Sequence, residues 1–337
     1  MHMILSDNHV HTFFSADSEA SIESHLLKAK EKHFTSICFT DHMDYEVFLP
    51  ENNVEFTFLQ DDYFATLRNL QKQYNDLEIR IGVELGLKDS IFSKALSLTK
   101  EYPFDFVIGS THVIDDYDPY YMDYWENFGE KEGIRHYYET TCENVLRGYD
   151  FDVYGHIDYV IRYAPTLKKA KKEGKDLEPL IEQFMTDNME CIEQILKKLI
   201  KCGHGIEANS GGYLAGLSHP NPHVKILALY HDLGGEILTI GSDAHDAINL
   251  GNQERKRRAG TENVAGIVGM AKAVSIGMHN LSENHEKLLS LRNYLIDRIL
   301  KEITDVVLNG SLENRLDANV SFGFRGIESQ SLILFLS

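Results

Sequence analysis

The chain has 337 residues and a formal net charge of −19 at pH 7, with 43% hydrophobic and 25% charged residues. This composition is typical of a soluble globular protein with room for one large α/β domain or a domain plus a partial second one. It argues against a membrane span and against nucleic acid or an anionic membrane as partner. The N-terminus has no signal-peptide pattern and the four cysteines show no close pairing, so we expect a cytoplasmic protein with reduced thiols.

Short apolar runs alternate with helical patterns through the first 250 residues, which predicts a parallel α/β sheet or barrel. The predicted strands cover residues 3–11, 35–40, 79–83, 104–109, 151–155, 205–208 and 237–240. The predicted helices cover residues 22–32, with Ser21 as N-cap, then 61–74, 131–146 and 177–201. The last helix carries one long apolar stripe, which we interpret as core.

The first predicted strand ends in His9-Val10-His11. Side chains alternate along a strand, so His9 and His11 point to the same side. Two imidazoles held in this way suit a divalent metal. Taken alone, the pair fits two half-exposed polar residues better.

Every later predicted strand also ends in a polar cluster. In β/α barrels these ends converge in space, although they are far apart in sequence. The candidate ligands at or near the strand ends are His9, His11, Asp17, His42, Glu84, His112, His156, Asp243 and His245. Each histidine alone could be a buried imidazole bonded to a carbonyl, but their joint occurrence favours a site. Nine side chains are more ligands than one ion can use, so the set suits the two or three metals that act in phosphoester hydrolysis. Such metals would also offset the acidic charge around an anionic substrate.

Six motifs in a fixed order resemble the polymerase and histidinol phosphatase (PHP) superfamily. They are His9-x-His11, Thr40-Asp41-His42-Met43-Asp44, Gly82-Val83-Glu84, Gly109-Ser110-Thr111-His112, Gly155-His156-Ile157-Asp158 and Ser242-Asp243-Ala244-His245. The segment from His11 to Asp17 is similar to the monofunctional histidinol-phosphate phosphatases of that superfamily. The resemblance covers residues 3–248.

The resemblance implies a distorted (β/α)7 barrel with a trinuclear site of Zn, Mn or Fe, in which all nine candidates are ligands and Glu84 is the bridge. Asp17 stands where many members carry a histidine. The implied reaction is hydrolysis of L-histidinol phosphate to L-histidinol and phosphate in histidine biosynthesis. Asp17, or one of the histidines His42 and His245, is the candidate to protonate the leaving oxygen.

A guanidinium is expected to bind the substrate phosphate, because its fork matches phosphate geometry. Arg162 resembles the phosphate-binding arginine of the family, although a solvated surface arginine is the alternative. The turn at residues 209–214 has no Arg or Lys where such phosphatases often carry a second basic residue. Asp115, Asp116 and Asp118 could face the cationic part of histidinol phosphate, and a solvated loop explains them equally well.

The composition changes near residue 251. Residues 1–250 hold 22 Lys and Arg against 42 Asp and Glu, whereas residues 251–337 hold 11 against 10. One motif in this part is Gly251-Asn252-Gln253-Glu254-Arg255-Lys256-Arg257-Arg258-Ala259-Gly260-Thr261-Glu262-Asn263-Val264, and it is followed later by Val307-Leu308-Asn309-Gly310 and Asn319-Val320-Ser321-Phe322. On these motifs, residues 252–337 resemble part of a cysteine desulfurase, a pyridoxal-phosphate enzyme of unrelated fold. The stretch lacks the Schiff-base lysine region, and the mobile cysteine loop would follow residue 337. We therefore expect no pyridoxal phosphate and a small, non-catalytic α/β appendage.

The appendage stands where the barrel would be expected to receive its closing helix. An apolar edge would be exposed there unless residues 267–276 substitute for that helix. We predict a cytoplasmic metallophosphatase in residues 1–248 that acts on a small-molecule phosphate. The alternatives are a PHP phosphoesterase for another small phosphate, or a metal-binding protein made non-catalytic by the fusion.

Overall fold

The computed structural model describes residues 6–48, 53–251, 281–312, 315 and 319–326. The chain divides into two compact units, Met1–Gly266 and Ile267–Ser337. The first unit contains every candidate site residue named above. Within the described ranges, no helix is long and apolar enough to cross a membrane.

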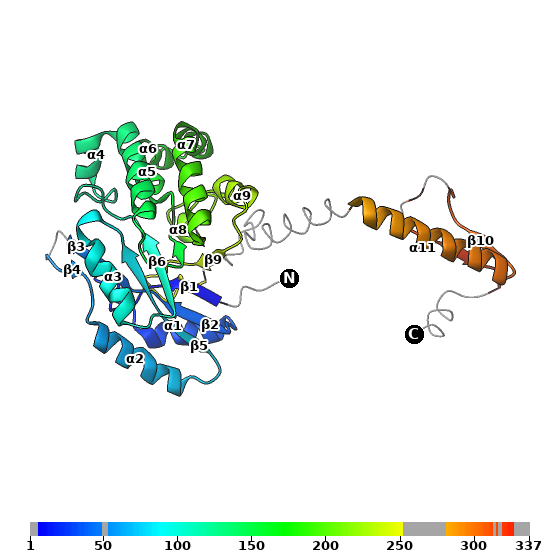
Figure 1. Ribbon diagram of the computed structural model, residues 1–337, viewed down its shortest axis with the longest axis horizontal. Coiled ribbons are helices and arrows are strands. Elements are labelled where there is room, and N and C mark those ends of the chain that lie inside the picture. Colours follow the sequence, from blue (N-terminus) through cyan, green and yellow to red (C-terminus); the bar gives the residue numbers. More distant parts are fainter. Residues whose placement is uncertain (1–5, 49–52, 252–280, 313–314, 316–318, 327–337) are drawn as a thin grey trace. The chain divides into compact units, whose positions relative to one another are not determined.

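The first unit is built on seven parallel strands that neighbour one another in chain order (Figure 1). They are β1 (Ser6–Val10), β2 (Ser36–Phe39), β5 (Glu78–Gly86), β6 (Phe106–Ser110), β7 (Val153–Tyr154), β8 (Gly205–Asn209) and β9 (Leu238–Gly241). The chain after β9 returns to β1, because the Asp243 N–H donates to the His9 carbonyl at 2.9 Å and the His11 N–H donates to the Ala244 carbonyl at 3.0 Å. These bonds close the sheet, which confirms the predicted barrel of seven parallel strands.

Helices connect the strands and lie outside them (Figure 1). They are α1 (Ile22–Glu31), α2 (Gln60–Gln73), α3 (Phe92–Glu101), α4 (Met122–Phe128), α5 (Glu130–Leu146), α6 (Pro165–Lys172), α7 (Glu178–Cys202), α8 (Gly211–Leu214) and α9 (Val224–Asp232), with short 3-10 turns η1 (Asp89–Ile91) and η2 (Tyr159–Tyr163). The predicted N-cap is confirmed, because the Ser21 side chain accepts a hydrogen bond from the Ser24 N–H at 3.2 Å. The sequence pattern did not predict α3, α4, α6, α8 and α9, most of which are short.

The structure corrects the predicted end of the second strand. β2 stops at Phe39, and His42 begins a separate strand, β3 (His42–Phe48), which pairs with β4 (Glu55–Phe56) and with the end of β5. The turn between β2 and β3 is held by the Asp41 carboxylate, which accepts hydrogen bonds from the Thr12 N–H at 2.6 Å and the Ser15 N–H at 3.1 Å. The new strand places His42 directly beside Glu84 in the sheet register.

The apolar stripe of α7 is core, as predicted. Its fully buried members are Ile181, Met185, Ile192, Ile195 and Leu199, and Phe184 and Met189 are partly buried against the same core. Burial of this stripe stabilises the 25-residue helix, because the packing of one apolar face supplies most of the stability of a helix in a protein.

The second unit contains helix α11 (Leu281–Glu302) and an antiparallel pair, β10 (Val306–Leu308) and β11 (Phe322–Phe324). A helix together with a strand pair agrees with the α/β character expected of the appendage. Large apolar side chains on it, such as Leu291 and Tyr294, are more than half exposed. The desulfurase-like motif at residues 252–264 and the predicted substitute helix at residues 267–276 lie outside the described residues.

Candidate metal centre

Glu84 is the centre of a buried cluster at the C-terminal ends of the strands. It lies near the end of β5, is 0% exposed, and meets five histidines from four other strands or strand ends. The contacts of Oε2 are His9 Nε2 at 3.0 Å, His11 Nε2 at 3.3 Å and His42 Nδ1 at 3.3 Å. The contacts of Oε1 are His156 Nε2 at 2.9 Å and His112 Nε2 at 3.2 Å.

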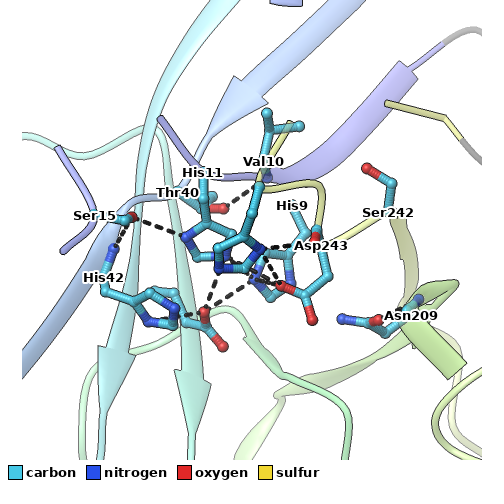
Figure 2. Close-up of polar contacts among 12 residues, drawn as sticks. His9, Val10, His11, Ser15, Thr40, His42, Asn209, Ser242 and Asp243 are labelled. Atoms are coloured by element: carbon cyan, nitrogen blue, oxygen red, sulfur yellow. Dashed lines mark hydrogen bonds and ion pairs between the residues drawn. The ribbon is translucent and has the colours of Figure 1, made fainter. Parts of the chain in front are cut away.

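Asp243 and His245, which follow β9, approach the same cluster from the other side. Asp243 Oδ1 lies 3.3 Å from His11 Nε2 and 3.6 Å from His9 Nε2. The His245 ring stacks on His11 with 4.2 Å between the ring centroids, and its Nε2 lies 3.1 Å from Asp17 Oδ2. Figure 2 shows the His9 and His11 rings beside the Asp243 carboxylate.

Three overlapping groups of side chains place one ligand atom each within 4.8 Å of one another. The groups are His9, His11, Glu84 and Asp243; His42, Glu84 and His112; and His11, His42 and His245. Buried imidazole nitrogens and carboxylate oxygens suit Zn, Mn or Fe, and shared side chains are typical of adjacent ions. The donor set therefore fits more than one divalent cation. His156 and Asp17 touch members of these groups without belonging to one.

The facing carboxylates and imidazoles of this cluster shift one another's pKa values, which favours protonated imidazoles. Burial alone would raise the pKa of the Glu84 carboxyl, but the facing imidazoles, above all His9, hold it well below its usual value. Burial would lower the pKa of His42, but the carboxylates of Asp17 and Glu84 outweigh burial and raise it to about 9. A divalent cation would displace these protons, so cation binding should release protons and weaken at low pH.

Two carboxylates behind the histidines were not among the sequence candidates for the site. Glu207 on β8 accepts a hydrogen bond from His9 Nδ1 at 2.6 Å and another from the His156 N–H at 3.2 Å. Asp44 Oδ2 lies 2.9 Å from His112 Nδ1 and 3.2 Å from His42 Nδ1. Such contacts fix which nitrogen of a ring faces the centre. Two features of the sequence could have revealed these residues. Asp44 stands two residues after His42, so strand alternation puts both side chains on the same face, and Glu207 is a lone carboxylate in an apolar strand.

The cluster opens into a pocket of about 560 Å³. Arg162, at the end of η2, is the only Arg or Lys among the described residues that line it. Its side chain is 7% exposed, and its Nε and Nη2 atoms are buried without a hydrogen-bond partner in the part of the chain that the structure describes. Buried guanidinium N–H groups that lack partners are costly, so this arrangement suits an anionic ligand.

Asp115, Asp116 and Asp118 were candidates to face the cationic part of the substrate, and only one of them lines the pocket. Asp118 lies beside Tyr159, whose hydroxyl donates to its Oδ1 at 3.3 Å. Asp115 is instead paired with His136 at 2.8 Å, and Asp116 is paired with Lys88. The sequence could not separate the three, because it does not show which loop residues turn inward.

The comparisons with known proteins find two different families, one matching each part of the sequence. The aminotransferase class-V family matches residues 227–337, and the cysteine desulfurase IscS of Dictyoglomus turgidum is 42% identical over 104 residues. Those residues are 31% of this chain and 26% of that enzyme, so the chain spans about a quarter of its desulfurase relative. The match begins within α9 and overlaps β9, which is nevertheless a barrel strand.

The N-terminal part of the chain matches a different group of proteins. The histidinol-phosphatase of Lactococcus lactis is 30% identical over 246 residues, which cover 72% of this chain and 84% of that protein. A crystal structure of histidinol phosphate phosphatase from the same species, complexed with Zn, L-histidinol and phosphate, has a TM-score of 0.62 and 27% identity over 75% of this chain and 88% of that one. The PHP domain matches residues 7–211. The chain therefore belongs to the PHP domain family.

Proposed function

We propose that the first unit is a metal-dependent phosphomonoesterase that hydrolyses L-histidinol phosphate to L-histidinol and phosphate. The observation that carries this proposal is the meeting, in one pocket, of the Glu84 cluster with the unpartnered N–H groups of Arg162. The Glu84 cluster would bind divalent cations and Arg162 would bind an anion, and a phosphate ester is a ligand that can contact both. The histidinol-phosphatase relative and the structure with Zn, L-histidinol and phosphate support the substrate.

We assign the metal centre to nine residues and expect two or three Zn, Mn or Fe ions, with Glu84 as the bridge. The ligands are His9, His11, Asp17, His42, Glu84, His112, His156, Asp243 and His245. Bound ions would neutralise the phosphoryl oxygens and provide a nucleophilic water at neutral pH. Glu207 and Asp44 would orient the rings of His9 and His112 for this purpose.

The side chains around the pocket would bind the phosphate and supply a proton to the leaving group. Arg162 binds phosphoryl oxygens and orients the ester, so that water attacks phosphorus in line with the bond to the leaving oxygen. That bond breaks, and the departing alkoxide requires a proton. His245 is the best placed donor, because its side chain is 31% exposed at the pocket and Asp17 outweighs burial to raise its pKa. Asp17 is 35% exposed, but His42 and His245 outweigh burial and hold its pKa well below its usual value, which favours a role as ligand and partner of His245. His42 lies behind them, with its Nε2 3.8 Å from Asp17 Oδ2.

The direct test is phosphate release from L-histidinol phosphate by the purified full chain, with bound metals quantified in the same sample. We expect release by the wild type and by a His231→Ala control in α9, and a loss of release and of metal in His9→Ala. Metal-replete wild-type protein that releases no phosphate would contradict the proposal and favour a non-catalytic metal-binding protein.

A phosphatase for another small phosphate is the second candidate, favoured by Arg162 being the only Arg or Lys among the described pocket residues. A panel of phosphomonoesters separates the two. A higher kcat/KM for any other ester than for L-histidinol phosphate would replace the proposed substrate.

We predict that Asp118 contributes to recognition of the cationic end of the substrate. Burial raises the pKa of Asp118 to about 6, so the carboxylate is charged above that pH and neutral below it. A charged hydrogen bond is worth roughly 1.5–3 kcal/mol, so Asp118→Asn should raise KM about tenfold or more at pH 8 with little change in kcat. The KM of the wild type should rise below pH 6 relative to that of the variant. Equal KM values at pH 8 would remove Asp118 from recognition.

We also propose that residues 252–337 are a desulfurase-like appendage without catalytic function or pyridoxal phosphate. A chain that ends at Gly251 should keep the kcat/KM of the full chain, because every assigned site residue precedes that point. Gly251 itself must stay, since its N–H donates to Asp7 Oδ2 at 2.9 Å and Leu250 is fully buried. The thermal unfolding midpoint of the same two proteins shows whether the removed residues cover the barrel, and a large loss of kcat/KM in folded, truncated protein would contradict the assignment.

A further inference from the structure

A second cluster of metal-ligating side chains lies outside the Glu84 centre. It joins Glu178, the first residue of α7, to His219 and His223 in the loop that precedes α9. One ligand atom from each of the three lies within 4.8 Å of the others, and His219 and His223 are 3% and 2% exposed. The two imidazole rings meet edge to face with centroids 4.3 Å apart.

His219 presents a free lone pair to this cluster. Its Nδ1–H donates to the Pro220 carbonyl at 2.7 Å, which leaves Nε2 as the unprotonated nitrogen. Nε2 is buried and has no hydrogen-bond partner within the described ranges. Burial lowers the pKa of His219, so the ring is neutral at physiological pH. A backbone carbonyl that fixes one ring nitrogen while the other stays open is a usual arrangement around a metal-binding histidine.

Glu178 and His223 already face each other across the site. His223 Nε2 lies 2.8 Å from Glu178 Oε1, and Ser218 Oγ donates to Glu178 Oε2 at 3.2 Å. The other nitrogen, His223 Nδ1, caps α9 by accepting the Lys225 N–H at 3.1 Å. Coordination of a metal through Nε2 would move the ring proton to Nδ1 and end this cap. The lost cap would weaken metal binding by about tenfold, which is small beside the affinity of protein zinc sites.

We propose that Glu178, His219 and His223 bind one Zn²⁺ ion at a site separate from the catalytic centre. Two imidazole nitrogens and one carboxylate oxygen match the ligands of zinc, and water can complete the tetrahedron. The Glu178 side chain is 35% exposed, which gives the ion a route from solvent. Glu178 belongs to α7 and both histidines belong to the loop before α9, so the ion ties the first turn of α7 to that loop.

The same loop is bonded to the segment that carries Arg162. The His223 N–H donates to Asp158 Oδ2 at 2.8 Å, and Asn221 Nδ2 donates to Asp158 Oδ1 at 2.6 Å. Asp158 immediately precedes η2, which ends beside the pocket with Arg162 and Tyr163. Zinc at the second site would therefore stabilise the support of the proposed phosphate-binding arginine without touching the substrate.

The test compares zinc content in full-length wild type, Glu178→Gln, His219→Ala and the control His231→Ala after equilibration with Zn²⁺ and removal of loosely bound metal. We expect the first two variants to hold one zinc fewer per chain than the wild type and the control. Glu178→Gln is partly exposed and keeps a hydrogen-bonding group, so it guards against a folding defect in His219→Ala. Equal zinc content in all four proteins would overturn the proposal.

Thermal unfolding provides a readout that does not depend on catalysis. Added Zn²⁺ should raise the Tm of the wild type and His231→Ala by more than that of Glu178→Gln, while the metal-free Tm values of these three stay close. The same zinc-dependent rise in Glu178→Gln would count against the site. The variants leave the Glu84 cluster intact, so phosphate release by the wild type tests the proposed function separately from the zinc count.

Discussion

Glu84→Gln should lower kcat for metal-dependent phosphate release by roughly 10³-fold or more and remove more than one ion from the protein. The Glu84 carboxylate is within 3.3 Å of nitrogen atoms on five histidines and belongs to two of the three candidate ligand groups. Loss of one preorganised charge-stabilising group typically costs 10²–10³-fold in kcat, and a group shared between ions should cost roughly 10³-fold or more.

The measurement for Glu84→Gln is kcat together with metal content by elemental analysis. Glu190→Gln is the matched control, because it makes the same chemical change at an exposed position on α7. Glutamine keeps the size of the side chain, so circular dichroism should show a folded barrel. Full metal content with wild-type kcat would contradict the assignment of Glu84 as the bridge.

Arg162→Ala should lower kcat/KM for L-histidinol phosphate by about 10²–10³-fold and should weaken inhibition by inorganic phosphate. Two charge-assisted hydrogen bonds of roughly 1.5–3 kcal/mol each account for this range after partial replacement by water. Arg162→Lys should recover only part of the loss, because an ammonium group cannot reproduce the planar fork.

Lys168→Ala is the control for the arginine. Arg162 and Lys168 both lie over the Tyr163 ring, at 5.9 Å and 5.1 Å from its centroid, but Lys168 does not line the pocket. Its replacement should leave kcat/KM and phosphate inhibition unchanged. If Arg162→Ala retained the phosphate affinity of the wild type, the anion would have to bind elsewhere in the pocket.

Most of the barrel could be predicted from the sequence because two regular signals coincide. Apolar runs mark the parallel strands, and a polar residue follows each run where chemistry collects in this architecture. His9, Glu84, His156 and Asp243 were singled out for this reason, and the structure brings them together, although their roles as ligands stay predictions. The start of β3 at His42 was missed, because only the side-chain contacts of Asp41 reveal the turn before it.

Residues that act from behind the cluster were harder to find. Glu207 and Asp44 look like ordinary strand carboxylates until the distances to His9 and His112 are known. His219 and His223 stand in a loop with no periodic pattern, and Glu178 reaches them from a helix more than 40 positions earlier in the sequence. Such contacts depend on the packing of distant segments, which local propensity and alternation do not encode.

The closure of the barrel also sets an order for folding. Asp7 and Ser242 are joined by a hydrogen bond across 235 positions of sequence, and His9 and Asp243 face each other at the same seam. Contacts of such long range form late, because the entropy of closing the intervening loop must be met first. During synthesis, His9 therefore emerges long before its partner exists, and the metal centre completes only when β9 has docked. Metal that binds ligands from both sides of this seam would therefore stabilise only chains that have finished folding.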